Sequence, residues 1–236
     1  GSNMGGKSST VRAVALCVIL AQLGAYVPAE SATLSLHDAV LTRVGASDEI
    51  ARSRSTFRVE VEETAEILRA CTGRSLVILD ELGRGTSTND GTAVAYAVLH
   101  HLMTRSIQAR PSLLFITHYF TLGTVAARPE LHGRLKNMHM AYSEQVDPAI
   151  GRKQVVFLYQ LRNGMASSSF GVHCAALAGM PEELLEVAAR KAKALEEETE
   201  KRRKVRRVRQ LARITKIIFP FEDSPDEALQ ALRETA

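Results

Sequence analysis

The first eight residues constrain the fold of this chain more than any other feature. They read GSNMGGKS and match the pattern GxxxxGK[ST] in full. Glycines let such a loop curl so that successive backbone N–H groups point at phosphate oxygens, and the helix that follows adds the positive end of its dipole. The motif therefore predicts a phosphate-binding loop at the N-terminus of a helix.

Two polar residues of this loop have distinct expected roles. We expect Lys7 to reach the β and γ phosphates of ATP and Ser8 to bind Mg²⁺. A loop of this kind follows a strand, and Gly1 is the first residue here, so we expect the supporting strand to be missing. The competing interpretation is a flexible, glycine-rich start, which the acidic strand described next disfavours.

An apolar run ends in two acids. Residues 75–81 read SLVILDE, which is typical of a buried parallel strand. Because open α/β sheets bind ligands at the carboxyl ends of their strands, we expect Asp80 to hold Mg²⁺ through its water shell. Glu81 is expected to orient or deprotonate the water that attacks the γ phosphate. Two acids at the start of a solvated loop would be the alternative, and the motif at residues 1–8 argues against it.

Strand and helix patterns alternate along the chain. We expect helices at residues 9–24, 59–70 and 92–104, the last capped by Asn89 or Asp90, and a buried strand at 113–119. Residues 42–56 read as a loop. This alternation predicts an α/β fold with a mostly parallel sheet flanked by helices.

His118 closes the second predicted strand. If the strands are parallel, it lies at the same sheet edge as Glu81 and could contact the γ phosphate or the attacking water. A structural histidine is an equally good interpretation of this position alone.

The sequence of the C-terminal half predicts two further strands, a helical segment and two domain boundaries. Runs at residues 135–141 and 155–161 are expected to add an antiparallel pair at the sheet edge, and the pattern is helical from residue 181. We expect a core at residues 1–163 and a helical extension at 164–200. A basic helix with a loosely held tail should occupy residues 201–236.

Composition excludes several classes of protein. With 236 residues and 45% hydrophobic content, the chain suits one α/β unit with a small extension. No run approaches the roughly 18 apolar residues of a spanning helix, so we expect a soluble intracellular protein. Cys17, Cys71 and Cys174 form no CxxC pair, which predicts neither a disulfide framework nor a zinc site, but small core residues.

The net charge of +4 is modest, but nine Lys or Arg residues fall between positions 201 and 216 without an acid among them. The apolar residues of this segment share one helical face: Val205, Val208, Leu211 or Ala212, Ile214 and Ile218. We favour a helix that docks on a partner. A nuclear-targeting or nucleic-acid-binding patch and a solvated face are the alternatives.

Several blocks, in this order, resemble the ATPase domain of the MutS family: GSNMGGKSS, YVPAES, GASDEIARSRSTF, VEETAEIL, LVILDELGRGTSTNDG, ITHY and SSSFGVHCAALAGMPEE. They cover most of residues 1 to about 195. The resemblance implies a P-loop ATPase of ABC-like type that works as a composite dimer, in which Ser55 and Thr56 of one subunit reach toward the nucleotide of the other. It also implies magnesium at Ser8 and Asp80, water activation by Glu81 with His118 nearby, and ATP contacts at Asn3, Gly5, Gly6, Lys7, Ser8 and Ser9.

Two positions depart from the family pattern. Ser2 stands where Pro is usual, which loosens the loop, and Arg58 follows Phe57 where an apolar residue is usual. The long stem of Arg58 can still lie along an apolar surface. Residues 164–183 resemble the helix-turn-helix of the family, which implies a mutual embrace of two ATPase subunits; DNA reading by the same segment is the alternative.

Within the family, LKNMHMAYSE, VVFLYQL and the basic tail after ARKAKALEEE are most similar to the branch of the third eukaryotic MutS homologue. This similarity implies a subunit in the nucleus (the cytoplasm for a bacterial source) that pairs with the second MutS homologue. Upstream domains would recognise mismatches or insertion and deletion loops in double-stranded DNA.

The expected function is ATP binding and hydrolysis that drives a mismatch-repair clamp. An ABC-type ATPase of transport or chromosome maintenance is the first alternative, although RSRSTF stands where those families carry an LSGGQ-type signature. The second alternative is a fragment that acts only as a dimerisation module and has no turnover of its own.

Overall fold

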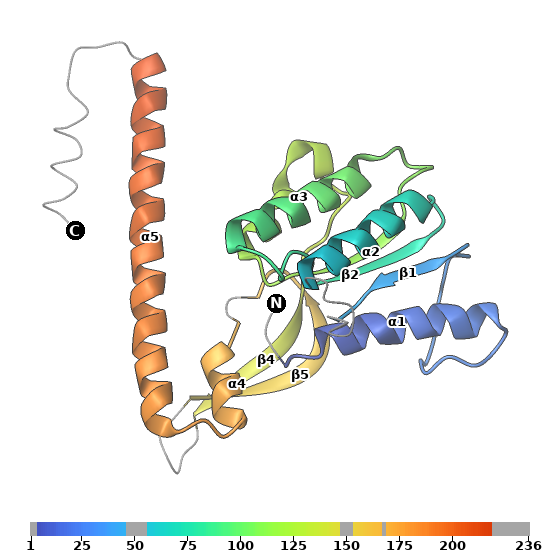
Figure 1. Ribbon diagram of the computed structural model, residues 1–236, viewed down its shortest axis with the longest axis horizontal. Coiled ribbons are helices and arrows are strands. Elements are labelled where there is room, and N and C mark those ends of the chain that lie inside the picture. Colours follow the sequence, from blue (N-terminus) through green and yellow to red (C-terminus); the bar gives the residue numbers. More distant parts are fainter. Residues whose placement is uncertain (1–3, 46–55, 147–152, 167–168, 219–236) are drawn as a thin grey trace, which may run out of the picture. The chain divides into compact units, whose positions relative to one another are not determined.

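The computed structural model describes residues 4–45, 56–146, 153–166 and 169–218 (Figure 1). The chain divides into two compact units, Gly1–Cys174 and Ala175–Ala236. All the candidate site residues belong to the first unit, which contains a parallel sheet flanked by helices.

The sheet has three parallel strands in the order β1-β2-β3. These are β1 (Val40–Arg43), β2 (Leu76–Asp80) and β3 (Ser112–Ile116). The parallel sheet confirms the predicted architecture, but β1 partly occupies the stretch at 42–56 that was predicted as a loop. Four residues are too few to show a strand period, and β1 is stabilised by its pairing with β2.

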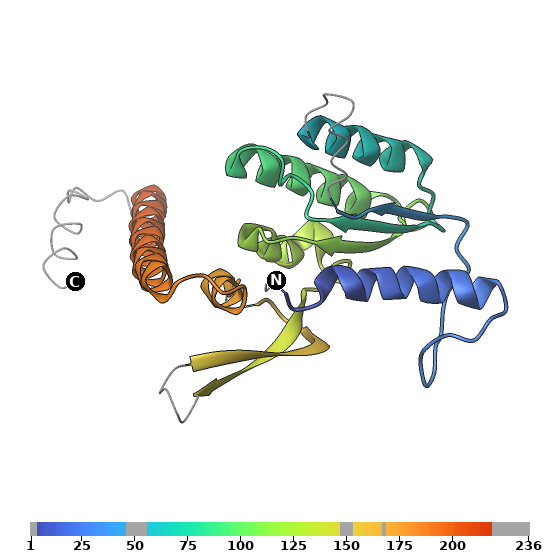
Figure 2. The same cartoon turned by 60° about the horizontal axis from the view of Figure 1, so that its bottom comes forward.

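Helices cover both faces of this sheet (Figure 2). Leu76 and Ile78 pack with α1 (Lys7–Gln22) on one face. Val77 and Leu79 pack on the other face with α2 (Thr56–Ala70) and α3 (Thr88–Thr104). Since successive side chains of a strand point to opposite faces, burial of both faces requires the unbroken apolar run of β2.

The three helices predicted within residues 9–104 all begin earlier than the sequence predicts, α1 at Lys7 instead of residue 9. α2 begins at Thr56, so Glu60 lies beyond the first turn and is buried, instead of facing the helix dipole at the N-terminus. α3 begins at Thr88, and its cap is Ser87, whose Oγ accepts from the backbone N–H of Asp90 at 3.2 Å. Asp90 therefore belongs to the first turn and is not the N-cap residue.

The segment after β3 leaves the strand earlier than predicted. β3 ends at Ile116, so His118 lies in the connection that follows it. Two 3-10 helices come next, η2 (Phe120–Ala127) and η3 (Pro129–Leu131). Their apolar side chains join the core beneath α3, which explains why a segment without a helical period is still well packed.

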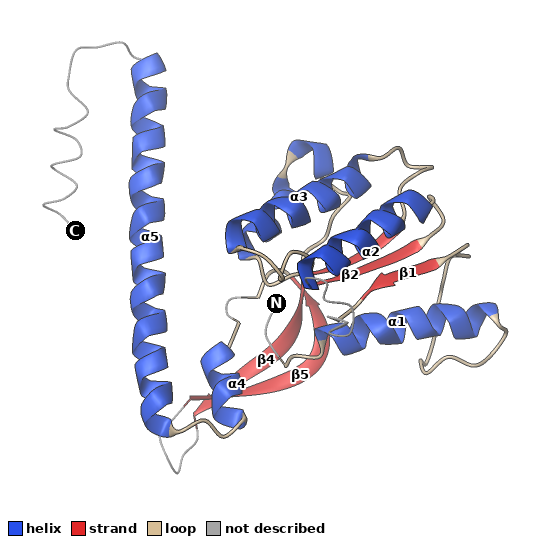
Figure 3. Ribbon diagram, in the orientation of Figure 1, coloured by secondary structure: helices blue, strands red, loops and turns tan. Residues whose placement is uncertain are grey.

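The strands β4 (Met138–Val146) and β5 (Lys153–Asn163) form a separate antiparallel sheet, not an addition to the edge of the parallel one (Figure 3). Met140 pairs with Leu161 and Tyr142 with Phe157, so β5 advances from residue 157 to 161 while β4 advances only from 140 to 142. The extra residues form a bulge, and Tyr159 within it has a φ of 53°.

The helices α4 (Gly171–Leu177) and α5 (Glu182–Ile218) close the described chain. α5 has 37 residues, which corresponds to about 55 Å at the usual rise of an α-helix. It runs without interruption through position 200, where the sequence analysis placed a boundary. Several of its apolar side chains are exposed, including Leu184, Val187, Leu195 and Val205. No described helix is long and apolar enough to cross a membrane.

Candidate functional site

The turn before α1 presents backbone N–H groups. Met4 and Gly6 both have positive φ, 56° and 87°, and Gly6 is the N-cap residue. Lys7 opens the helix, with Ser8 and Ser9 in its first turn. Because the first N–H groups of an α-helix have no intrahelical partner, this turn is suited to an anion. Asn3, predicted to contact the same ligand, lies outside the described residues.

Lys7 shares its surroundings with the acids at the end of β2. Burial lowers the pKa of the Lys7 ammonium below its ordinary value, and the carboxylates of Glu81 and Asp80 act in the opposite direction. Neighbouring charges have such an effect only over short distances. The structure therefore brings together the lysine and the two acids that the sequence placed some seventy residues apart.

Asp80 has the features of a cation ligand. Its side chain is buried, and its Oδ1 atom has no hydrogen-bond partner among the described residues. A buried carboxylate oxygen of this kind is costly unless a cation or water completes it. The described residues contain no group of three or more His, Cys, Asp or Glu side chains that would hold a metal ion. This donor set fits Mg²⁺, which takes one or two protein oxygens and fills its other positions with water and phosphate.

Glu81 follows directly and has a strained backbone. Its φ is 55°, a left-handed conformation that non-glycine residues rarely adopt. The Glu81 N–H donates to the carbonyl of Ile116 at 3.0 Å, which fixes the acid to the end of β3. Its carboxylate pairs with Arg84. Backbone strain of this type occurs mainly at sites where the surrounding structure holds a functional group in place.

His118 lies within the electrostatic reach of Glu81. Burial lowers the pKa of the imidazole below its usual value of 6.5, while the Glu81 carboxylate raises it. The ring contacts that of Tyr119 in a tilted arrangement, with centroids 4.3 Å apart. The lowered pKa favours the neutral imidazole, which can accept or donate one hydrogen bond.

Thr56 is exposed at the first position of α2, on the face of the sheet opposite α1 (Figure 2). Ser55, its predicted companion, lies outside the described residues, as does Ser2. Arg58, the departure from the family pattern in this segment, stays in solvent and forms an ion pair with Glu62 at 2.8 Å. The arginine is thus accommodated by a pair one turn away, not by an apolar surface.

Tyr159 is a site residue that the sequence analysis missed. A Cβ added to Gly6 would lie 3.0 Å from the Cδ1 atom of Tyr159, so the ring rests against the turn before α1. The side chain is 68% exposed, which leaves an aromatic surface beside this turn. Tyr159 lies within the bulge of β5, and no local sequence pattern reveals the register of a hairpin.

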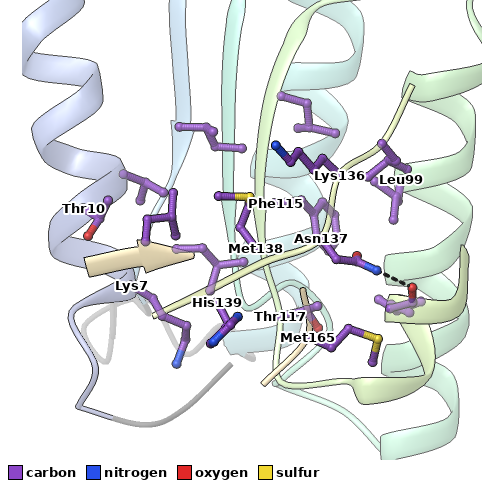
Figure 4. Close-up of a pocket in the computed structure, with 18 of the residues that line it drawn as sticks. Lys7, Thr10, Leu99, Phe115, Thr117, Lys136, Asn137, Met138, His139 and Met165 are labelled. Carbon is purple, nitrogen blue, oxygen red and sulfur yellow. Dashed lines mark hydrogen bonds between the residues drawn. The ribbon is translucent and has the colours of Figure 1, made fainter. Parts of the chain in front are cut away.

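A cavity of about 570 Å³ runs along the outer edge of β3 (Figure 4). Lys7 and Thr10 line it from α1, Leu99 from α3 and Phe115 from β3 itself. Asn137 closes another side, and its Nδ2 donates to the carbonyl of Gly123 at 2.7 Å. In the described part of the chain, β3 pairs with β2 alone, so its other edge faces this cavity.

The comparisons with known proteins identify the family of the chain. The profile of MutS domain V matches residues 1–196. The DNA mismatch repair protein MSH3 of Cryptococcus neoformans is 47% identical over 230 residues, 98% of this chain and 19% of the relative. MSH3 of Phaeosphaeria nodorum is 48% identical over 234 residues, 99% of the chain and 20% of the relative. The msh3 protein of Emericella nidulans is 52% identical over 204 residues, 86% of the chain and 18% of the relative.

These relatives are mismatch-repair proteins of fungi, and the chain spans about a fifth of their length. The family match covers most of the chain, including every site residue described above. The chain therefore belongs to the MutS family, and its sequence is of the MSH3 type.

Proposed function

We propose that this site binds ATP with Mg²⁺ and hydrolyses the γ phosphate, as a P-loop ATPase of ABC-like type. The observation that carries the proposal is the meeting of Lys7, at a helix N-terminus, with the unbonded buried oxygen of Asp80 and the strained Glu81. An anion-binding turn, a cation ligand and a fixed carboxylate are the parts that phosphoryl transfer to water requires.

In this proposal the turn before α1 holds the phosphates. The backbone N–H groups of Gly5, Gly6 and Ser9 point at the phosphate oxygens, and Lys7 neutralises the β and γ phosphates. Asn3 is proposed as a further ATP contact. Tyr159 offers an aromatic face beside Gly6, on which the adenine ring would stack.

Ser8 and Asp80 would hold Mg²⁺, which when bound neutralises the charge that develops on the phosphates. Glu81 orients the attacking water and accepts its proton, and its left-handed backbone at the end of β2 supports this role. His118, which interacts electrostatically with Glu81, would donate a hydrogen bond to the γ phosphate or accept one from the water. Catalysis then comes mainly from positioning and charge neutralisation.

The cavity along β3 fits a further parallel strand. Its length follows the free strand edge, and its walls are the helices α1 and α3. We assign it to a segment of the parent protein that leads into the turn before α1. Such a strand would pair with β3 and support the turn from below, as the sequence analysis expected.

For the whole protein we propose a mismatch-repair clamp whose nucleotide state controls its grip on DNA. Upstream domains would recognise mismatches or insertion and deletion loops, and a second MutS homologue would complete the composite site. Ser55 and Thr56 would reach the nucleotide of that partner, residues 164–200 would embrace it, and the complex would act in the nucleus. In this proposal residues 1–163 form the ATPase core, and the basic segment at 201–236 docks on a partner.

A second candidate is a dimerisation module without turnover. The exposed apolar side chains of α5 favour a helix that needs a partner. This candidate predicts association of the chain with a partner subunit but no ATP hydrolysis by the assembled complex.

The test uses the parent protein assembled with its partner subunit. Lys7→Ala should abolish binding of a fluorescent ATP analogue at this site, whereas Glu81→Gln should retain binding and stop turnover at this site. Glu130→Gln, an exposed acid on η3, is the matched control and should leave both unchanged. Continued hydrolysis at this site in either site variant would overturn the assignment.

A further inference from the structure

The conformation of Glu81 depends on groups outside the proposed reaction site. A non-glycine residue at φ 55° returns to a relaxed conformation unless its neighbours on both sides are held. The chain is held on both sides of Glu81 by hydrogen bonds to buried side chains. The carbonyl of Asp80, one residue before, accepts one such bond. The N–H of Gly83, two residues after, donates one, and its carbonyl accepts another.

Arg43 holds the first of these points. It ends β1, its side chain is 8% exposed, and its Nη1 donates to the carbonyl oxygen of Asp80 at 3.1 Å. Two acids on α2 balance its charge, Glu60 at 3.8 Å and Glu63 at 3.7 Å. A buried arginine is costly without such partners, and apolar residues would pack the same space equally well.

Glu60 and Tyr119 hold the second point. The buried Glu60 carboxylate accepts from the Gly83 N–H, and the Tyr119 hydroxyl donates to the Gly83 carbonyl at 2.7 Å. Gly83 itself has a φ of 92° and packs against the backbone of Gly91. Its peptide groups are therefore fixed from three directions, by α2, by α3 and by the connection after β3.

The same network reaches the start of α2. A Cβ added to Gly85 would lie 3.0 Å from the Cα atom of Phe57, so the loop after Glu81 rests directly on the first turn of α2. Glu60 follows Phe57 by less than one helical turn and bonds to Gly83. A shift of the N-terminus of α2 must therefore be accompanied by a shift of the loop that carries Glu81.

We propose that Arg43, Glu60 and Tyr119 are positioning residues that hold Glu81 in its left-handed conformation and tie that conformation to the position of α2. The inference rests on the proposed ATPase function and deepens it. Arg43 and Glu60 touch no reacting atom in this scheme, and they act through the backbone of Asp80 and Gly83. The start of α2, which begins at Thr56, can then alter the hydrolysis of the nucleotide bound by its own chain.

The experiment compares three variants of the parent protein, each assembled with its partner subunit: Tyr119→Phe, Glu60→Gln and Arg43→Lys. Each keeps the approximate volume of the side chain. Tyr119→Phe removes the hydrogen bond to the Gly83 carbonyl, and Arg43→Lys displaces the one to the Asp80 carbonyl. Glu60→Gln keeps an oxygen that can accept from the Gly83 N–H but removes the charge that balances Arg43. Tyr96→Phe and Arg105→Lys are matched controls, because Tyr96 bonds to Arg128 on the surface and Arg105 bonds to the far end of α2. Turnover, ATP affinity and melting temperature are measured for all five.

We expect turnover at this site to fall by about 10- to 100-fold in the three variants, since a displacement of about 1 Å can cost a factor of about 100. For Tyr119→Phe, ATP affinity and melting temperature should stay close to those of the unmutated complex. This variant tests the inference even if a variant of the buried Arg43–Glu60 pair unfolds. The controls should be fully active.

Three results would be informative against the scheme. Loss of ATP affinity with normal turnover at saturation would refute positioning, because it would place these residues in nucleotide binding. Normal turnover in Tyr119→Phe and in every folded variant of the ion pair would refute the inference and leave the ATPase function intact. An unmutated complex without any turnover from this site would instead refute the proposed function.

Discussion

Replacement of Gly83 by alanine tests the packing of the loop after Glu81. The φ of 92° at this position costs a non-glycine residue about 1–2 kcal/mol. The new Cβ would also lie 2.4 Å from the carbonyl oxygen of Gly91. Backbone atoms must move apart to relieve this contact, and overpacking of this kind costs about 1–3 kcal/mol. We therefore expect Gly83→Ala to lower the free energy of unfolding by about 3 kcal/mol in total.

Two other glycines separate the contributions. Gly133 has a φ of 73° but no atom within 4 Å of an added Cβ, so Gly133→Ala should show the conformational cost alone. Gly91 lies inside α3, and its added Cβ would lie 2.1 Å from the Gly83 carbonyl oxygen and 2.4 Å from the Tyr119 hydroxyl. Gly91→Ala should therefore show the steric cost, reduced by the roughly 1 kcal/mol by which alanine favours a helix over glycine. Turnover should fall with Gly83→Ala and Gly91→Ala, and stay normal with Gly133→Ala.

The chain has no tryptophan, so thermal unfolding is best followed by circular dichroism and not by tryptophan fluorescence. A loss of about 3 kcal/mol corresponds to a melting temperature lowered by about 6–12 °C in a unit of this size. Equal shifts for Gly83→Ala and Gly133→Ala would refute the reasoning, since the contact with α3 would then contribute nothing.

Four further predictions concern the core and the site. Leu79→Ala should lower the free energy of unfolding by about 3 kcal/mol in urea titrations, because Leu79 is fully buried between the sheet and its helices. Burial lowers the pKa of Lys7 below 10.5, so its positive charge is lost at a lower pH than that of an ordinary lysine. ATP affinity should therefore fall across the alkaline range. A Lys7→Arg variant that binds ATP should lack this pH dependence. Burial also lowers the pKa of His118 below 6.5, so turnover should be level near neutrality and fall only in acid. The unfolded chain takes up this proton first, so the His118 contribution to stability should also decrease as the pH falls through 6.5, which acid titration of His118→Asn against the unmutated chain would show.

Much of the fold was predictable because β2 and its acids carry a strong local signal. The apolar run at residues 75–81 required two covered faces, and the parallel pairing of β2 and β3 followed from the helix between them. By contrast, β1 is too short for a periodic pattern. The predicted start of α2 was too late, because Glu60 was expected near a helix terminus but is buried in an ion pair. Pairings with distant residues decided both cases.

The site divides in the same way. Lys7, Asp80 and Glu81 stand in contiguous motifs whose geometry is fixed by neighbouring residues, so their meeting could be predicted. Tyr159 could not, because its position depends on two extra residues in the register of a hairpin. Arg43 was also missed, since a single arginine in a short edge strand has no sequence signature.

Within the described residues β3 pairs only with β2, and this open edge has a consequence for handling the chain in solution. An unpaired strand edge with apolar neighbours is a template on which other strands assemble, and natural sheets avoid leaving one bare. Protein preparations in which nothing fills the cavity along β3 should therefore aggregate as their concentration rises. A longer polypeptide that covers this edge would remove the template, so aggregation behaviour is itself a measure of whether the sheet has been completed.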